Sequence, residues 1–157
     1  MIFLLLKSKI EFFVKMIIHH SFFFSTEPAV YKIADDGYSY KMHTGKKTWQ
    51  EAEDICKQEG GHLAMVKTQA THDYVTKTWN NDFWIGVNDI SQEGNYQFVD
   101  GSPVMTAFWA PRQPDNHENK EDCIHYMPIK QKWNDNRCNV KKSFLCQTGG
   151  RSYVNVL

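Results

Sequence analysis

The chain has 157 residues, of which 14% are aromatic, a content that fits one folded domain and argues against a disordered chain. Its 18 basic and 18 acidic residues cancel, so no net charge points to nucleic acid or to an anionic membrane. A partner must therefore be recognised by a local site.

The first segment of the chain, residues 1–25, is apolar but interrupted by charges: MIFLLLKSKIEFFVKMIIHHSFFFS. Its longest apolar run is too short for a membrane-spanning helix, which needs about 20 predominantly apolar residues. It is also a poor signal peptide, because its basic residues follow the apolar run and no small-x-small cleavage site is clear. We expect a degenerate secretion signal or a misassigned start, with Met16 as the true first residue, or else a loosely packed extension.

The next segments predict a strand and a helix. Residues 38–45, YSYKMHTG, alternate aromatic and polar side chains before a glycine, which is typical of an edge strand that leads to a turn. In the following TWQEAEDICKQEGG, Thr48 and Glu51 form a capping box, and two glycines end the helix. Its buried face should consist of Trp49, Ala52, Ile55 and Cys56.

A second helix is predicted from about Thr68 to Trp79, with Tyr74 and Val75 on its buried face beside Trp79. The apolar run FWIGV predicts a buried strand, and NYQFVDGSPV predicts a strand that runs into an Asp-Gly turn. Three further short strands are expected at CIHYM, QKWND and KSFLCQ. Two helices followed by many short strands indicate an α+β domain, with the helices segregated from an antiparallel sheet.

The four cysteines contain no Cys-x-x-Cys pair, which argues against a zinc knuckle or a thioredoxin-type site. Two disulfides formed in an oxidising compartment are the better interpretation, and four reduced core cysteines are the alternative. Three pairings are open, and the sequence alone does not choose among them. We favour the nested pairing, because a bond between Cys123 and Cys138 would close the base of the polar segment that precedes them.

That polar segment, residues 112–123, reads RQPDNHENKEDC and offers a hydrophobic core almost nothing. Calcium takes six to eight oxygen ligands from carboxylates, carbonyls and water. The segment supplies oxygen donors at Gln113, Asp115, Glu121 and Asp122, and a later WND motif adds Asn134 and Asp135. A set made only of oxygen donors favours calcium over zinc or copper.

Several spaced motifs together resemble the C-type lectin domain in its short form: WIGV at 84–87, QPD at 113–115, EDC at 121–123, WND at 133–135 and the four cysteines. The resemblance covers about residues 30–148 and leaves a C-terminal tail, residues 149–157. It implies the C-type lectin fold, with two helices packed on short antiparallel sheets and a long calcium-binding loop. It also implies the nested disulfides, Cys56 with Cys146 and Cys123 with Cys138.

The resemblance implies two sets of calcium ligands. The sugar-binding ion would be held by Gln113, Asp115, Glu121, Asn134 and Asp135. A cis peptide bond before Pro114 would aim the flanking oxygens at this ion. A second, weaker calcium position would map onto Asp89, Glu93, Asn116, Asp122 and the Glu121 carbonyl. The family usually has an aspartate where this chain has Asn116, which removes one negative charge.

The sugar preference follows from the same resemblance. A calcium ion with open positions can accept two adjacent sugar hydroxyls, which also exchange hydrogen bonds with its ligands. Gln-Pro-Asp in place of the family's Glu-Pro-Asn reverses the donor and acceptor pattern, which in this family implies galactose-type ligands. His117 stands where galactose-type members often have a stacking tryptophan, so selectivity should be modest. The expected sugar contacts are Gln113, Asp115, His117, Glu121, Asn134 and Asp135.

The predicted function is therefore calcium-dependent binding of galactose or N-acetylgalactosamine on glycans or glycoproteins, by a secreted, extracellular protein with a homo-oligomer as an option. The alternatives are a lectin-like module that binds protein or mineral matrix without sugar, and a solvated loop that has lost calcium. We do not expect an enzyme, even with His125 as a candidate base. The acids lie in one short loop, whereas glycoside hydrolysis needs two carboxyls that flank a cleft.

Two further side-chain environments are predicted. Trp133 should belong to the hydrophobic core rather than form a ligand platform. The basic residues around the polar segment should form a solvated rim: Lys120, Lys130, Lys132 and Arg137.

Overall fold

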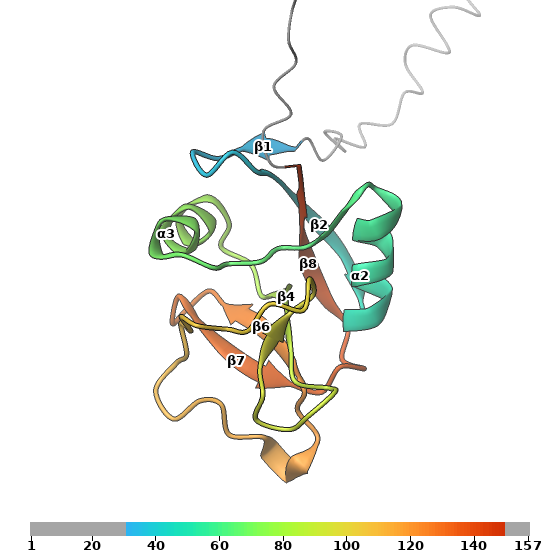
Figure 1. Ribbon diagram of the computed structural model, residues 1–157, viewed down its shortest axis with the longest axis vertical. Coiled ribbons are helices and arrows are strands. Elements are labelled where there is room, and N and C mark those ends of the chain that lie inside the picture. The colour runs from blue at the N-terminus through green and yellow to red at the C-terminus, as the bar shows by residue number, and fades with distance from the viewer. Residues whose placement is uncertain (1–30, 150–157) are drawn as a thin grey trace, which may run out of the picture.

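Two α-helices and an eight-stranded sheet make up the part of the chain that the computed structural model describes, residues 31–149 (Figure 1). The predictions for residues 1–25 and for the tail beyond Gly149 lie outside these residues. No helix among residues 31–149 is long and apolar enough to cross a membrane. In chain order the elements are β1 (Lys32–Ile33), β2 (Ser39–Lys47), α2 (Trp49–Gln58), β3 (Gly61–Leu63), α3 (Gln69–Thr78), β4 (Phe83–Asn88), β5 (Gln97–Phe98), the 3-10 helix η1 (His117–Asn119), β6 (Cys123–Met127), β7 (Lys132–Asn136) and β8 (Lys142–Thr148).

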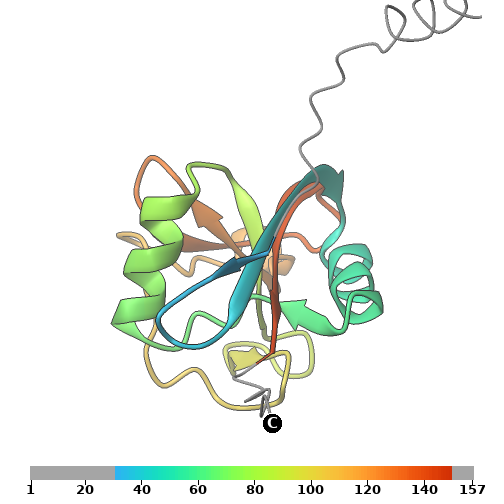
Figure 2. The ribbon, with the colours of Figure 1, turned by 90° about the horizontal axis from the view of Figure 1, so that it is seen from above.

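The strands are hydrogen-bonded in the order β1-β2-β8-β4-β6-β7, with β3 added to β8 and β5 added to β4. The two helices lie on opposite sides of the central β2 and β8 pair (Figure 2). All pairs are antiparallel except β4 with β8, which run parallel at Phe83 and Trp84. The expectation of a purely antiparallel sheet is wrong at this pair. Parallel neighbours need a long connection, and the segment from 89 to 141, which includes the polar loop, provides it.

The two predicted helices are confirmed almost to the residue. The Thr48 side chain accepts a hydrogen bond from the Glu51 backbone, and the Glu51 side chain accepts one from the Thr48 backbone at 2.9 Å. In α3, Thr68 caps the N-terminus and Trp79 the C-terminus. Each helix also buries polar side chains that its apolar pattern did not predict: Glu53 on α2, and Thr71 and His72 on α3.

Two predicted strands differ from what forms. Residues 39–47 pair with β8 on one side and, at Ser39 and Tyr40, with β1 on the other, so β2 is an edge strand along only part of its length. In NYQFVDGSPV the strand is limited to Gln97–Phe98. The turn that follows holds Gly101 at a φ of 81°, and the Gly101 backbone nitrogen donates to the Phe98 carbonyl at 2.8 Å. Beyond Phe98 the chain enters this turn, and only single backbone bonds continue the pairing, such as that from the Val99 nitrogen to the Gly86 carbonyl at 3.0 Å.

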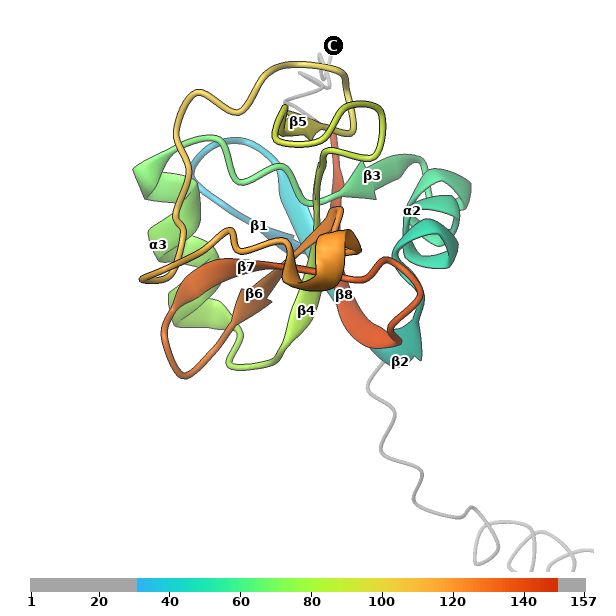
Figure 3. The same ribbon diagram turned by 90° about the horizontal axis from the view of Figure 1, so that it is seen from below.

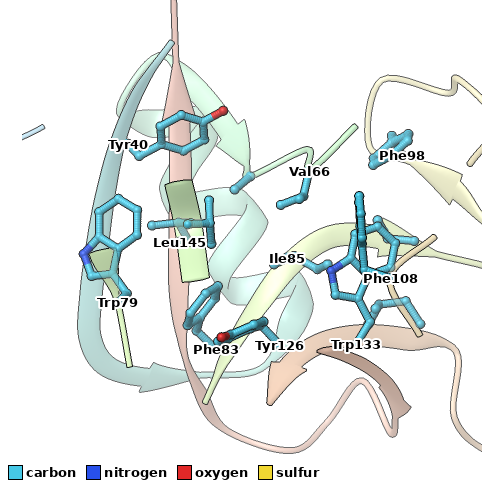
Figure 4. Packing of buried hydrophobic residues seen from close by; sticks show 14 of the residues in the cluster. Tyr40, Val66, Trp79, Phe83, Ile85, Phe98, Phe108, Tyr126, Trp133 and Leu145 are labelled. Carbon is cyan, nitrogen blue, oxygen red and sulfur yellow. The ribbon is translucent and has the colours of Figure 1, made fainter. Parts of the chain in front are cut away.

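The hydrophobic core continues from the helices to the base of the polar loop. Figure 4 shows Phe83, Leu145 and Tyr126 between the strands, with Phe108 and Trp133 at the other end of the cluster. The rings of Phe108 and Trp133 lie 5.3 Å apart and edge to face. Trp133 is only 1% exposed, which confirms that it belongs to the core.

Both disulfides have the nested pairing that was predicted. Cys56 on α2 is bonded to Cys146 on β8, and Cys123 on β6 is bonded to Cys138 just after β7. The bonds close loops of 90 and 15 residues, for which chain entropy alone predicts roughly 4.6 and 3 kcal/mol of stabilisation. The shorter one ties the end of the polar loop, at Cys123, to the residues that directly follow β7.

Gly86, in the WIGV motif of β4, provides a test of this packing. A Cβ added there would lie 2.5 Å from the Leu63 carbonyl oxygen, a backbone atom that cannot move without disturbing β3. Gly86→Ala should therefore destabilise the domain by about 1 to 3 kcal/mol, as overpacking does. At Gly45 an added Cβ meets nothing within 4 Å, so Gly45→Ala is the control. Equal urea midpoints for the two variants would contradict the packing described.

Candidate functional site

The polar loop protrudes at the end of the molecule away from β1, with η1 at its tip (Figures 1 and 3). Several of its residues other than glycine have left-handed backbone conformations, which cost energy for most side chains. They are Arg112 (φ 68°), Asn116 (φ 40°), Glu118 (φ 60°) and Asn119 (φ 55°). Interactions within the loop must offset this cost.

Three carboxylates converge where the loop meets the end of β7. Oxygen atoms of Asp115, Glu121 and Asp135 all lie within 4.8 Å of one another. Asp115 is exposed, Glu121 is 9% exposed and Asp135 is fully buried. The structure thus brings together three of the five residues that the sequence proposed for the first calcium position, from segments 20 residues apart.

Backbone donors of the loop hold these carboxylates in place. Asp135 accepts hydrogen bonds from the backbone nitrogens of Asp115 and Asn116, at 3.3 and 2.7 Å. Glu121 accepts one from the backbone nitrogen of His117 at 3.1 Å. The Asn116 side chain in turn accepts from the Glu121 backbone at 3.1 Å. Asn116 therefore closes the loop on itself, a role that its sequence context did not reveal.

The predicted ligand set also includes two amide side chains, Gln113 in the loop and Asn134 on β7. The peptide bond between Gln113 and Pro114 is cis, as the resemblance implied. The Gln113 side-chain oxygen is buried and has no hydrogen-bond partner among the described residues. Asn134 donates its side-chain nitrogen to the Asp135 carbonyl, which leaves its own carbonyl oxygen available. Gln113 is two residues from Asp115 in the chain, so this unpartnered oxygen belongs to the same loop as the clustered carboxylates.

Among the described residues, no basic side chain forms an ion pair with the three clustered carboxylates. Burial, together with the negative charges of Asp135 and Asp115, raises the pKa of Glu121 above its ordinary value. The nearby basic side chains of Lys120 and Arg137 both pair with Glu118 at the outside of the loop. A hard divalent cation bound by oxygen donors would satisfy both the unpartnered oxygen and the clustered charge. The residues present therefore fit calcium.

The second predicted calcium position is less complete. Asp89 is 1% exposed, and one of its carboxylate oxygens accepts from the Gly94 backbone at 2.8 Å while the other has no partner among the described residues. Burial raises the pKa of Asp89 to about 6, and the charges of Glu93 and Asp122 add to the shift. Within residues 31–149, however, the carboxylate oxygens of Asp89, Glu93 and Asp122 do not all lie within 4.8 Å of one another, as those of the first position do. Asn116 is engaged in the loop instead.

Other residues singled out in the sequence have clear environments. The His117 side chain is 68% exposed at the tip of the loop, where a ligand could touch it. His125 is buried, and its Nδ1 lies 2.6 Å from an oxygen of Asp82, the residue before β4. Arg137 is not simply a solvated side chain, since it forms an ion pair with Glu118 at 2.5 Å. Contacts between residues this far apart in the chain leave no mark on local sequence patterns.

Comparison with known proteins decides the family. Residues 45–148 match the family model described as the lectin C-type domain. The chain belongs to the C-type lectin domain family. Mouse C-type lectin domain family 4 member F is 38% identical to it over 121 residues, which are 71% of this chain but only 22% of that protein. Lectin BRA-3 of Megabalanus rosa is 34% identical over 117 residues, covering 71% of this chain and 72% of that lectin.

Solved structures confirm the C-type lectin fold. The mouse scavenger receptor C-type lectin carbohydrate-recognition domain aligns with a TM-score of 0.72 and 27% identity, over 77% of this chain and 96% of that domain. A calcium-independent type II antifreeze protein also aligns with a TM-score of 0.72, at 23% identity over 79% of this chain and 95% of its own. The C-type lectin fold alone therefore does not imply calcium, and only the side chains of this domain can indicate a metal.

Asp89 provides a pH test in calcium-free lectin domain. Its pKa of about 6 in the folded state exceeds the ordinary 3.8, so the native state binds more protons between these values, and stability falls as pH rises through them. Asp89→Asn should remove that cost. In chelator the variant should gain roughly 2 to 3 kcal/mol over the parent at pH 7, and almost nothing at pH 4.

Urea unfolding at both pH values measures this difference, and the exposed Asp54→Asn on α2 is the control. An Asp89→Asn effect that is the same at pH 4 and pH 7 would show that the Asp89 carboxylate is not destabilised by burial.

Proposed function

We propose that this domain binds sugars through a calcium ion held by Gln113, Asp115, Glu121, Asn134 and Asp135. The observation that carries the proposal is the convergence of three carboxylates within 4.8 Å, at a loop that also holds a buried glutamine oxygen without a hydrogen-bond partner among the described residues. Mutual repulsion makes such a cluster unfavourable on its own, so it is expected where a cation binds. The names of the relatives, a lectin and a carbohydrate-recognition domain, support the same function.

The donor set leaves room for a ligand on the ion. The residues supply one oxygen each from three carboxylates and two amides, whereas calcium takes six to eight oxygens. Bound calcium would supply a positive centre to which neutral hydroxyls can add. The exposed position of Asp115 keeps the outer side of the site open to solvent and hence to a sugar.

A galactose-type sugar fits the pair that flanks Pro114. Glutamine can donate a hydrogen bond from its amide nitrogen while its oxygen faces the metal, whereas aspartate can only accept. Each sugar hydroxyl on calcium needs one donor and one acceptor among the ligands, so the order of amide and carboxylate selects the orientation of a vicinal diol. His117 follows Asp115 by two residues, and its exposed side chain can contact the sugar ring.

The setting of the domain follows from its covalent structure. The bonds Cys56–Cys146 and Cys123–Cys138 persist in oxidising surroundings, which supports a secreted or extracellular location. A module that holds calcium but recognises protein or mineral matrix is the alternative function. Release by free sugar separates the two, because only a sugar-binding site is competed by galactose.

Calcium should stabilise the domain by mass action, because it binds only the native state. Millimolar calcium should raise the melting temperature of the purified protein, and chelator should reverse the rise. Glu121→Gln removes one carboxylate from the cluster and should abolish most of this response, whereas Asp54→Asn on α2 should preserve it.

Calorimetry with calcium and elution from a galactose column check both parts of the proposal. An identical melting curve with calcium and with chelator would exclude the metal site. Calcium binding without release by galactose would favour the alternative function.

The double variant Gln113→Glu with Asp115→Asn tests sugar selectivity. It preserves one carboxylate and one amide, so calcium affinity should change little. The donor and acceptor pattern is reversed, and each mismatched polar contact costs about 1 to 3 kcal/mol. A shift from galactose towards mannose of about tenfold or more is expected in a glycan-binding assay. Unchanged sugar ranking with calcium still bound would show that this pair does not set selectivity.

A further inference from the structure

The tip of the loop is joined to the sheet by one ion pair between distant residues. A carboxylate oxygen of Glu118, in η1, lies 2.5 Å from Nη2 of Arg137 and 3.2 Å from Nζ of Lys120. The other oxygen of Glu118 lies 3.8 Å from Nε2 of His117. Three basic side chains thus meet at one exposed acid, on what we call the outer side of the loop, while two of the three clustered carboxylates, Glu121 and Asp135, are buried on its inner side.

The two cations differ in what they connect. Lys120 is two residues from Glu118 and belongs to the same loop, so its ion pair is local. Arg137 is 19 residues away and comes directly after β7. Its neighbour Cys138 is bonded to Cys123 and accepts a hydrogen bond from the Trp49 backbone at 3.0 Å. Of these two ion pairs, only the one with Arg137 ties the tip of the loop to the fixed framework of the domain, in addition to the hydrogen bonds that Asp135 accepts at the start of the loop.

The loop needs such a tie because its own energetics oppose closure. Glu118 itself has a φ of 60° and lies between two other left-handed residues, Asn116 and Asn119. The inner carboxylates repel one another until a cation arrives. An anchored positive charge on the outer side pulls the loop towards the sheet without neutralising the calcium ligands.

We propose that Arg137 is a positioning residue, which through Glu118 holds the loop closed so that the calcium ligands are already assembled before the ion binds. The proposal rests on the calcium site of the proposed function. A basic side chain then favours the binding of a cation, because it holds the calcium ligands in place before the ion arrives.

The sign of that effect makes the proposal testable. A fixed positive charge near a cation site repels the ion, so by Coulomb's law alone the removal of Arg137 should tighten calcium binding. If Arg137 positions the loop, its removal should weaken calcium binding instead. Lys120→Met is the matched control, because it removes a positive charge from the same acid without cutting the tie to the sheet.

Calcium titration by calorimetry at low ionic strength should give an affinity about threefold to fivefold weaker for Arg137→Met, the range expected for an exposed ion pair. Lys120→Met should bind calcium as the parent does or more tightly. The charge-exchanged double variant, Glu118→Arg with Arg137→Glu, should recover parental affinity within about twofold, and raised salt should shrink all these differences.

A second measurement does not need the ion. In chelator, the backbone amides of residues 115–120 should exchange hydrogen faster in Arg137→Met than in the parent. In Lys120→Met their exchange rates should equal those of the parent. Circular dichroism and the melting temperature in chelator confirm that each variant is folded, and Glu118→Gln, which weakens the same ion pair from its other side, replaces Arg137→Met if that one is not.

The inference is overturned if Arg137→Met binds calcium as tightly as the parent or more tightly, or if its loop amides exchange at the parental rate. Failure of the proposed function has a different signature: the parent itself then binds no calcium. In that case the exchange experiment still decides whether Arg137 holds the loop.

Discussion

Asp135 lies fully buried on β7, and its carboxylate accepts hydrogen bonds from the backbone nitrogens of Asp115 and Asn116. These bonds fix the start of the loop against the sheet and set its carboxylates beside one another. A buried carboxylate that lost its donors would carry a large desolvation cost, so loop closure and Asp135 burial depend on each other. The geometry of the candidate site therefore originates in a strand residue rather than in the loop.

The scaffold supports that strand from two directions. Trp133 packs against Phe108, and the backbones of residues 108 and 110 are hydrogen-bonded to Trp133 at 2.8 and 2.9 Å, which covers the outer edge of β7. The disulfide between Cys123 and Cys138 holds β6 and the end of β7 together. A rigid base allows a loop with several left-handed residues to adopt one conformation, as an ion site made from separate segments requires.

The inner and outer sides of the loop differ in their charge. On the inner side, burial and the charges of neighbouring carboxylates raise the pKa of Glu121, which favours a bound cation. On the outer side, Lys120 and Arg137 already pair with Glu118. The proposed preorganisation by Arg137 and the proposed calcium site are thus two parts of one electrostatic arrangement.

The sequence by itself determined the local features and, through its spaced motifs, the family. The Thr48 capping box, the helix ends and the oxygen donors are encoded over a few neighbouring residues, and the nested disulfides and cis bond followed from the resemblance. Only the tertiary structure decided the parallel pairing of β4 with β8, the hydrogen bond from the Glu121 backbone to the Asn116 side chain, and the bond between Glu118 and Arg137. The same holds for the finding that, among the described residues, the carboxylates of Asp89, Glu93 and Asp122 do not form a close cluster. Each of these depends on where segments far apart in the chain meet, and periodicity and capping signals describe only the segment in which they occur.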